Sequence, residues 1–475
     1  MSVSTELQPL WTADDIAAAT DGRKLADFNV ANVVFDSRQV QTGDLFIALK
    51  GASADGHDHV AGALARGAGG ALVTHVPEGV PPDAPLVLVE DTMVGLEDLA
   101  RAGRARVDAV AIGVTGSVGK TGTKEALKVA LAPSGPTHAS VGSFNNHVGV
   151  PLTLARMPAG TRFGVFEMGM NHAGELTPLS RLVRPHIAIV TTVEPAHMAF
   201  FDSVEAIADA KAEIFAGVPA GGAAVLNRDN RHFERLSAAA RARGLHVVAF
   251  GTGEGCHVRL LDLALKPEMT VVDAMVGSRP VTYKIGAPGR HWAMNSLAVM
   301  AAVELSGADL SLAAMALADM APPAGRGRRL TVNLPKGGSF TLVDESYNAS
   351  PASMRAAFAN LALSTPGPRG RRIAILGDMR ELGENADALH AGLAPDLVAA
   401  EVDIVHVCGP HMRALYDALP DRLKGRYATD SKTLASCVSE GIRQADVVVV
   451  KGSLGSYMAV IIDTLLKLDS ADSPR

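Results

Sequence analysis

Short runs of apolar residues recur along the whole chain and alternate with segments of helical periodicity. In the first part of the chain these runs lie at 33–35, 45–49, 70–73 and 86–89, with a helical stretch at 59–66. From Val107 onward, strands are predicted at 107–112, 163–168, 187–193 and 222–226, with helical patterns between them. Strands that alternate with helices are typical of a parallel, doubly wound sheet, which we predict for this central region.

A segment rich in proline and glycine interrupts the pattern near residue 322. An Ala-rich helical region that begins after Gly286 ends in Ala321-Pro-Pro-Ala-Gly325, a composition that favours a hinge. Beyond it, strands predicted at 340–343, 372–376, 402–408 and 446–450 again alternate with helices. We therefore predict an α/β chain of three domains: 1–90, a small α/β domain; 91–322, a central, mostly parallel sheet with a phosphate loop; and 323–475, a Rossmann-like domain.

Composition and charge exclude several classes of protein. The chain has 475 residues and a formal net charge of -6, and its acidic and basic residues are interspersed, so it lacks the basic patch of a nucleic-acid or membrane-surface binder. No apolar segment has the length of a membrane span, and the N-terminus lacks a signal-peptide core. We expect a cytoplasmic protein whose separated cysteines, Cys256, Cys408 and Cys437, are reduced thiols.

The strongest chemical signal is a glycine-rich loop between a predicted strand and a predicted helix. It reads Gly116-Ser-Val-Gly-Lys-Thr121. Glycines let backbone N–H groups turn toward phosphates, the lysine reaches the outer phosphates, and the threonine hydroxyl suits Mg²⁺. The usual motif has a further glycine at position 114, where this chain has valine. We predict an ATP site here, against the alternative of a turn that only connects two elements.

Polar residues that follow the next strands could add a metal site. Glu167 ends the strand after the loop and lies at the carboxyl edge of the predicted sheet, where such folds bind ligands. Its carboxylate is a ligand that Mg²⁺ prefers. His197 follows the next strand and is expected at the same edge. Each has a structural alternative: a solvated or helix-capping glutamate, and a structural histidine.

Lys211 lies on the apolar face of a predicted helix, together with Val204, Ile207 and Ile214. An inward-facing ammonium is costly unless it is paired or deprotonated. One reading is a lysine that snorkels to solvent or pairs with Glu167 or a phosphate. The other, which the helix pattern alone ranks second, is a lysine of lowered pKa that reacts with CO₂ to give a carbamate ligand for a second Mg²⁺.

Six short motifs follow one another along the chain: Thr115-Gly-Ser-Val-Gly-Lys-Thr121, Asn145-Asn-x-x-Gly149-x-Pro151, Phe166-Glu-Met-Gly169, Ala196-His197, Ala210-Lys211 and Gly289-x-His291-x-x-x-Asn295. In this order they resemble the Mur ligases, bacterial enzymes that build the peptide of the cell-wall precursor. The resemblance implies three domains, for a UDP-sugar substrate, for ATP, and for the incoming amino acid or dipeptide. It also implies ATP and two Mg²⁺ ions as cofactors and a monomeric enzyme.

The Mur ligases add the residues of this peptide in successive steps, and other motifs of the chain point to one of these steps. The segments 34–38, 43–51 and 55–58 look like the N-terminal domain of the third-step and fourth-step ligases. The Asp-Asn-Pro-Arg signature of the third step is absent, whereas Asp344-Glu-Ser-Tyr-Asn-Ala-Ser-Pro351, 376–383 and 449–453 are similar to the fourth-step enzyme. The resemblance thus implies ligation of D-alanyl-D-alanine to UDP-N-acetylmuramoyl-tripeptide through an acyl phosphate. Alternatives are the third-step diamino-acid ligase, a folylpolyglutamate-type ligase, or a nucleotide-binding switch without catalysis.

The resemblance also implies roles for individual residues. Thr121 and Glu167 would hold one Mg²⁺, and His197 with a carbamylated Lys211 would hold the other. The catalytic residues would be Lys120, Glu167, His197 and Lys211. The UDP-sugar peptide would meet Ser37, Arg38, Asn145 and Asn146. ATP would meet Thr115, Gly116, Ser117, Val118, Gly119, Lys120, Thr121, His291, Asn295, Arg326, Asp344 and Glu345.

Four positions depart from the family's usual pattern. Glu345 replaces an aspartate, and Ser350 replaces an asparagine. Gly122 follows the phosphate loop where serine or threonine is more frequent, and Leu454 stands where an arginine often follows Lys-Gly-Ser. The last departure leaves the expected carboxylate-binding arginine without a counterpart at that position.

Overall fold

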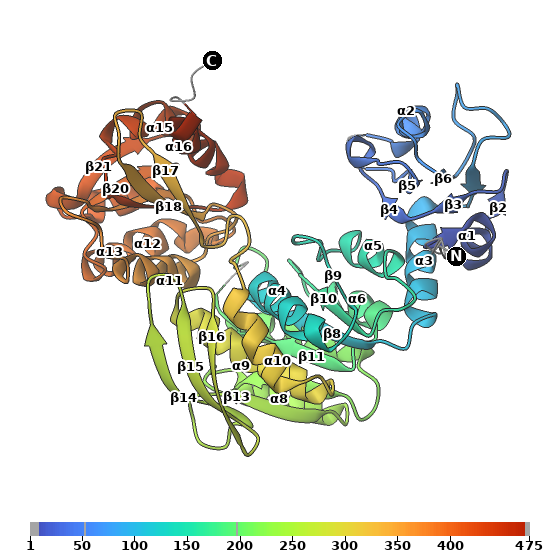
Figure 1. The fold of residues 1–475 in the computed structure, drawn as a ribbon, viewed down its shortest axis with the longest axis horizontal. Coiled ribbons are helices and arrows are strands. Elements are labelled where there is room, and N and C mark those ends of the chain that lie inside the picture. The colour runs from blue at the N-terminus through green and yellow to red at the C-terminus, as the bar shows by residue number, and fades with distance from the viewer. Residues whose placement is uncertain (1–8, 52–53, 196–197, 471–475) are drawn as a thin grey trace, which may run out of the picture.

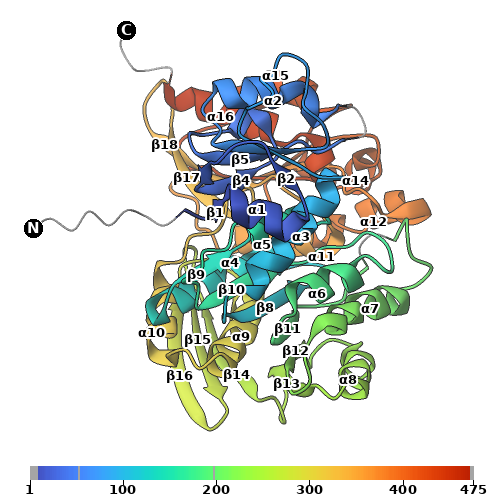
Figure 2. The ribbon, with the colours of Figure 1, turned by 90° about the vertical axis from the view of Figure 1, so that its right-hand side faces the viewer.

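The computed structural model describes residues 9–51, 54–195 and 198–470, which form three α/β units in chain order (Figure 1). In Figure 1 the C-terminal unit lies at the upper left and the N-terminal unit at the upper right of the central one. In Figure 2 the N-terminal unit lies in front of the C-terminal unit, above the central one. The expectation of a three-domain α/β chain is therefore confirmed.

The N-terminal unit is a small sheet in the order β2-β7-β6-β5-β4, parallel except for the β2–β7 pair. Helices α1 and α3 pack on one face of this unit and α2 on the other, and α3 also contacts α5 of the central unit. The elements are β1 (Trp11–Thr12), α1 (Ala13–Thr20), β2 (Arg23–Lys24), β3 (Asn29–Val30), β4 (Asn32–Val34), β5 (Asp44–Ile47), α2 (Val60–Ala65), β6 (Gly70–Val73), β7 (Leu86–Leu88) and α3 (Thr92–Ala105).

The central unit is built on a sheet in the order β16-β15-β14-β13-β12-β11-β8-β10-β9. The parallel part comprises β8 (Val110–Thr115), β9 (Thr137–Ala139), β10 (Phe163–Glu167), β11 (Ile187–Val190), β12 (Ala223–Asn227) and β13 (His246–Gly251). Four of these strands were predicted, whereas β9 and β13 were not. An antiparallel meander that was not predicted extends the parallel part: β14 (Val258–Leu265), β15 (Thr270–Val276) and β16 (Arg279–Ile285).

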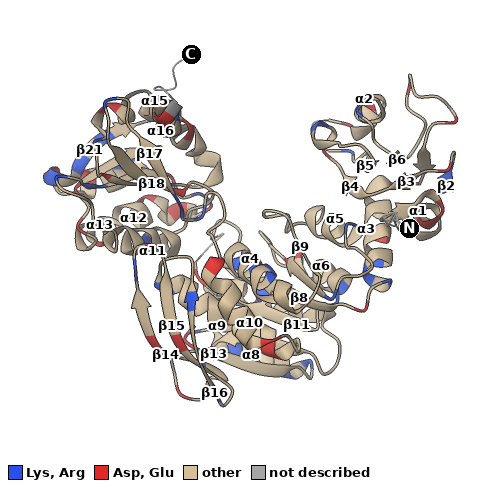
Figure 3. Cartoon of the chain, in the orientation of Figure 1, with Lys and Arg blue, Asp and Glu red and all other residues tan. Residues whose placement is uncertain are grey.

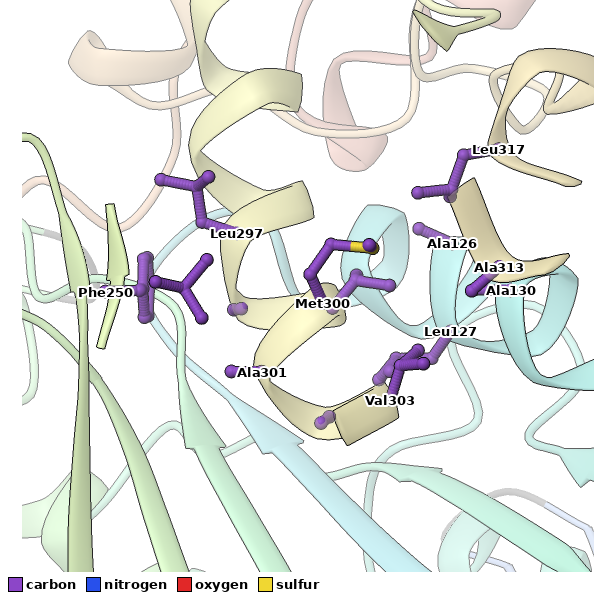
Figure 4. Packing of buried hydrophobic residues seen from close by; sticks show 14 of the residues in the cluster. Ala126, Leu127, Ala130, Phe250, Leu297, Met300, Ala301, Val303, Ala313 and Leu317 are labelled. Carbon is purple, nitrogen blue, oxygen red and sulfur yellow. The ribbon is translucent and has the colours of Figure 1, made fainter. Parts of the chain in front are cut away.

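Helices cover both faces of the parallel strands, which is why these strands are almost continuously apolar. Figure 4 shows one of the two cores, in which α9 lies between Phe250 of β13 on one side and Leu127 of α4 with Ala313 of α10 on the other, where Met300 points. The helices on this face are α4 (Lys120–Leu131), α9 (Arg290–Leu305) and α10 (Leu310–Ala316); those on the other are α5 (Gly149–Ala155), α6 (Leu176–Val183), α7 (Val204–Ala212) and α8 (Phe233–Ala242).

The C-terminal unit has a sheet in the order β17-β18-β22-β19-β20-β21, parallel except at its β17 edge. Helices α11 to α14 cover one face, and α15 and α16 the other. The elements are β17 (Arg328–Asn333), β18 (Ser339–Glu345), α11 (Pro351–Ala362), β19 (Arg372–Gly377), α12 (Ala386–Ala391), α13 (Ala394–Ala399), β20 (Ile404–Cys408), α14 (Met412–Ala418), β21 (Lys424–Ala428), α15 (Ser431–Val438), β22 (Val447–Lys451) and α16 (Ala459–Ser470).

Basic and acidic residues are mixed over all three units (Figure 3). Among the helices of the described ranges, none combines the length and the hydropathy that a membrane span requires.

Candidate active site

The phosphate loop is shorter than usual because the strand before it begins and ends three residues later than predicted. β8 continues to Thr115, and Val114 is a fully buried strand residue in register with Glu167 of β10. Only 116–119 remain between this strand and α4, so position 114 belongs to the strand and has no need of a glycine. Gly119 has φ +87°, which favours glycine.

The loop is fixed to the neighbouring strand through small polar side chains. Thr191, just after β11, donates its hydroxyl to Val118 O at 2.6 Å. Ser117 Oγ donates to Glu194 O at 3.0 Å and accepts from the N–H of Glu194 at 2.9 Å. Ser117 and Val118 therefore hold the shape of the loop with their own groups.

Lys120 lies over the loop, since its Nζ donates to Gly116 O at 2.8 Å. Burial lowers the pKa of Lys120, the carboxylate of Glu167 opposes that shift, and the cation of Arg326 adds to it. Lys120 and Glu167 of the central unit and Arg326 beyond the hinge therefore share one electrostatic environment.

Ser143 connects the phosphate loop to the residue beyond the hinge, and it was not predicted as a site residue. Its Oγ lies 3.3 Å from the Thr121 hydroxyl and accepts from Arg326 Nη2 at 3.1 Å. The Arg326 guanidinium carbon also lies 4.4 Å from the ring centre of Tyr347. Arg326 thus joins the central unit to the C-terminal unit at the phosphate loop.

A buried lysine holds the segment that carries Ser143 and Asn145. Lys124 is fully buried and donates from Nζ to Ser140 O at 2.8 Å and to Gly142 O at 3.0 Å, besides pairing with Glu125. This role was not predicted from the sequence, because a lysine in the second turn of a helix is usually exposed to solvent.

Glu167 is 1% exposed, and only one of its two carboxylate oxygens is hydrogen-bonded within the described residues. Its Oε1 accepts from Asn145 Nδ2 at 2.7 Å, whereas Oε2 has no hydrogen-bond partner within the described part of the chain. A buried carboxylate oxygen without a partner is unfavourable, and a hard cation such as Mg²⁺ would satisfy it. The residues present therefore fit a magnesium ion, and Asn145, predicted to face the substrate, orients this carboxylate.

Lys211 is 1% exposed and points into the unit from α7, as its place on the apolar face predicted. Its Nζ makes no hydrogen bond or ion pair with any residue that the structure describes. Burial lowers the pKa of Lys211 well below its ordinary value, and the cation of Lys120 lowers it further. These findings argue against a snorkelling lysine and against a pair with Glu167.

The predicted metal ligands are only partly placed. His197, predicted to hold the second ion, lies outside the described residues. In the described ranges, no three His, Cys, Asp or Glu side chains gather as a ready-made metal site. A Mg²⁺ here would therefore rely on Thr121, Glu167 and substrate phosphates, the usual arrangement for this ion.

Helix α9 carries His291 and Asn295, two of the residues that ATP was expected to meet. A Cβ at Gly119 would lie 2.8 Å from Asn295 Nδ2, so this amide borders the phosphate loop. A Cβ at Gly122 would lie 2.8 Å from the Trp292 ring, which explains why serine or threonine is replaced by glycine. Burial lowers the pKa of His291, and the negative charge of Glu345 opposes this shift.

The C-terminal residues Asp344 and Glu345 end β18 beside the hinge. Asp344 Oδ2 accepts from the N–H of Gly325 at 3.0 Å and so holds the hinge segment. Glu345 Oε2 accepts from Lys451 Nζ at 3.2 Å. Ser350 caps α11 with its hydroxyl, directly before the proline at the first helical position, a role that suits serine as well as asparagine.

A pocket of about 1050 Å³ is lined by residues of α3 and of the central unit. Asn145 and Asn146 line it, as do Gly169 and the arginines Arg101, Arg181 and Arg184 from α3, α6 and the residue after α6. Two of the predicted substrate residues, Ser37 and Arg38, are not among its lining residues. Arg38 is exposed on the N-terminal unit and forms a bidentate pair with Asp36, at 2.9 and 2.8 Å.

Three family models match successive parts of the chain. "Mur ligase family, catalytic domain" covers residues 29–104, "Mur ligase middle domain" covers 114–303, and "Mur ligase, glutamate ligase domain" covers 328–454. A protein of Rickettsia prowazekii named UDP-N-acetylmuramoyl-tripeptide–D-alanyl-D-alanine ligase is 31% identical over 96% of this chain and 99% of its own length.

Solved structures agree with this similarity. The crystal structure of MurF from Acinetobacter baumannii superposes with a TM-score of 0.82 at 26% identity, over 96% of this chain and 99% of that one. The structure of MurF ligase from Thermotoga maritima in complex with ADP has a TM-score of 0.75 at 25% identity, over 93% and 98% of the two chains.

Proposed function

The chain belongs to the Mur ligase family, and we propose that it joins D-alanyl-D-alanine to UDP-N-acetylmuramoyl-tripeptide, converting ATP to ADP and phosphate. The product is the pentapeptide precursor of peptidoglycan. The observation that carries this proposal is the junction at Ser143, where Thr121 of the phosphate loop meets Arg326 from beyond the hinge, close to the buried carboxylate of Glu167.

We assign a substrate to each part of the chain. Residues 1–90 would bind the UDP-sugar, 91–322 would bind ATP, and 323–475 would bind the dipeptide. The pocket beside Asn145 and Asn146 has the position and size for the peptide of the first substrate, since Asn145 lines it and also binds Glu167. Its arginines suit a peptide that carries several carboxylates.

The reaction requires two anions to meet, because the terminal carboxylate of the tripeptide attacks the γ-phosphate of ATP. Lys120 and Arg326 supply positive charge from both sides of the hinge, and they offset this repulsion. Two Mg²⁺ ions, when bound, would neutralise further charge and align the attacking and leaving oxygens. Thr121 and Glu167 would hold one ion, and His197 with Lys211 as a carbamate would hold the other.

The second step is attack of the dipeptide amine on the carbonyl carbon of the acyl phosphate, with phosphate as the leaving group. An acyl phosphate reacts with water unless the site excludes it. The Arg326–Ser143 hydrogen bond spans the hinge and keeps the C-terminal unit over the phosphate loop, which provides that protection.

Replacement of Arg326 by alanine tests this closure. The change removes a charged hydrogen bond to Ser143, worth about 1.5–3 kcal/mol. We expect kcat/KM for ATP to fall about 10- to 150-fold, since each 1.36 kcal/mol is tenfold in rate. Steady-state kinetics with varied ATP measure this, and Arg328→Ala, an exposed neighbour on β17, is the matched control. Equal kcat/KM in both variants would contradict the role of Arg326.

A substrate panel tests the proposed reaction itself. Phosphate release is measured with UDP-N-acetylmuramoyl-tripeptide and D-alanyl-D-alanine, with the dipeptide precursor and a free diamino acid, and with a folate and glutamate. We expect turnover only with the first pair. Turnover with the diamino acid would indicate the third-step ligase, and ATP hydrolysis unaffected by any precursor would indicate a nucleotide switch.

A further inference from the structure

Neighbouring strands of the C-terminal sheet end in loops that are joined into one cluster. The loops follow β18, β22 and β19, which lie side by side and run parallel, so all three leave the same carboxyl edge, where such sheets bind ligands. Ser453 connects them: its N–H donates to Asp378 O at 3.1 Å, its hydroxyl donates to Ala349 O at 3.4 Å, and it accepts from the N–H of Arg380 at 3.0 Å.

Arg380 is held in this cluster by the backbone. Its Nη2 donates to Gly455 O at 2.6 Å, and a Cβ at Gly455 would lie 2.9 Å from Arg380 Nε, so the guanidinium lies directly against the backbone of this glycine. No carboxylate of the described residues forms an ion pair with Arg380. An exposed guanidinium placed in this way keeps N–H groups free for the two oxygens of a carboxylate.

Two large, exposed apolar residues lie on either side of Gly455 along the loop after β22. Leu454 is 63% exposed and Tyr457 is 68% exposed. Tyr457 also has φ +52°, an uncommon conformation for a bulky residue, which occurs mostly where the surrounding structure imposes it. The cluster thus combines one cation with apolar surface, which matches a small ligand that carries a carboxylate and methyl groups.

The cluster lies at the junction with the ATP-binding unit. Ala199 of the central unit donates its N–H to Glu381 O, directly after Arg380, at 3.3 Å. Lys451, at the end of β22, and its partner Glu345 both act on the pKa of His291 in α9. A ligand bound at Arg380 is therefore on the side of the C-terminal unit that faces the phosphate loop.

We propose that Arg380 binds the C-terminal carboxylate of D-alanyl-D-alanine, with Leu454 and Tyr457 against its methyl groups. This assignment rests on the proposed function and names the residue that recognises the second substrate. Leu454 provides no charge at its position, and the guanidinium of Arg380 supplies one to the same loop through its bond to Gly455. Arg380 binds and orients the dipeptide so that its amine reaches the acyl phosphate.

The test uses the full-length enzyme with D-alanyl-D-alanine and with its C-terminal amide, which lacks the carboxylate charge. In the wild type, the amide is expected to have a kcat/KM about 100-fold lower, the scale of a lost bidentate charged pair. Arg380→Ala is expected to raise the KM for D-alanyl-D-alanine about 100-fold, to leave the KM for ATP and UDP-tripeptide within about twofold, and to abolish the discrimination against the amide.

Two further variants complete the design. Arg380→Lys keeps the charge without the planar fork and is expected to fall between the wild type and Arg380→Ala. Arg413→Ala removes an exposed arginine that pairs with Asp417 on α14 and is expected to behave as the wild type. An unchanged KM for D-alanyl-D-alanine in Arg380→Ala, or equal discrimination against the amide in Arg380→Ala and the wild type, would overturn the role of Arg380 but not the proposed function. A wild type without turnover on D-alanyl-D-alanine would overturn the proposed function as well.

Discussion

Replacement of Lys211 by alanine is expected to lower the rate of ligation about 10³-fold, the size of effect that loss of a preorganised electrostatic group produces. Lys211 is buried and has no partner among the residues that the structure describes, and burial holds its pKa well below the ordinary value. A neutral amine reacts with CO₂, and the resulting carbamate would give the site a second anionic metal ligand. Removal of the side chain leaves that ligand position empty.

Chemical rescue separates this role from simple packing. Formate, acetate or propionate added to Lys211→Ala is expected to restore part of the activity, because a small carboxylate can occupy the space of the carbamate. The matched control is Lys128→Ala, which replaces an exposed lysine on α4. Its rate of ligation is expected to equal that of the wild type, with or without added acid. Full activity of Lys211→Ala, or a folded variant that no acid rescues, would contradict the carbamate.

Replacement of Glu167 by glutamine is expected to lower kcat about 10²- to 10³-fold. The glutamine has nearly the same shape but no charge, and Glu167 Oε2 is the buried oxygen that fits a cation. The amide also presents an N–H₂ group to a site that has to hold Mg²⁺. We therefore expect the Mg²⁺ concentration for half-maximal rate to rise as kcat falls, which a titration of rate against Mg²⁺ measures.

The matched control for this change lies on α7, the helix that carries Lys211. Glu205 is exposed, and Glu205→Gln removes the same charge from the same unit without touching the site. Its Mg²⁺ dependence should match the wild type. If Glu167→Gln retained the wild-type rate and the wild-type Mg²⁺ dependence, Glu167 would be a structural residue and the magnesium assignment would fail.

The parallel core could be predicted because burial on both faces leaves a strong pattern in the sequence. β10 and β11 are buried at every position, and both were predicted near their observed bounds. The meander β14 to β16 was missed because its strands leave one face to solvent, so exposed polar residues such as Asp262 break the apolar runs. The inward direction of Lys211 was predicted from helical periodicity alone, and its burial confirms it.

Contacts that depend on the folded chain could not be predicted. Ser143 bonds to Thr121, 22 residues away, and to Arg326, 183 residues away, and nothing in its local sequence distinguishes it from any loop serine. Arg380 could be read from the sequence as part of a motif, but its placement on Gly455 requires two loops from different strands to meet. Such residues become visible only when the sheet edges are known.

The most direct test of the central claim follows oxygen from the peptide to phosphate. UDP-N-acetylmuramoyl-tripeptide labelled with ¹⁸O in its terminal carboxylate is incubated with ATP, Mg²⁺ and D-alanyl-D-alanine, and the released phosphate is analysed by mass spectrometry. Attack of that carboxylate on the γ-phosphate predicts that each phosphate released carries one ¹⁸O atom from the tripeptide. Release of unlabelled phosphate alongside pentapeptide formation would contradict activation of the carboxylate by ATP.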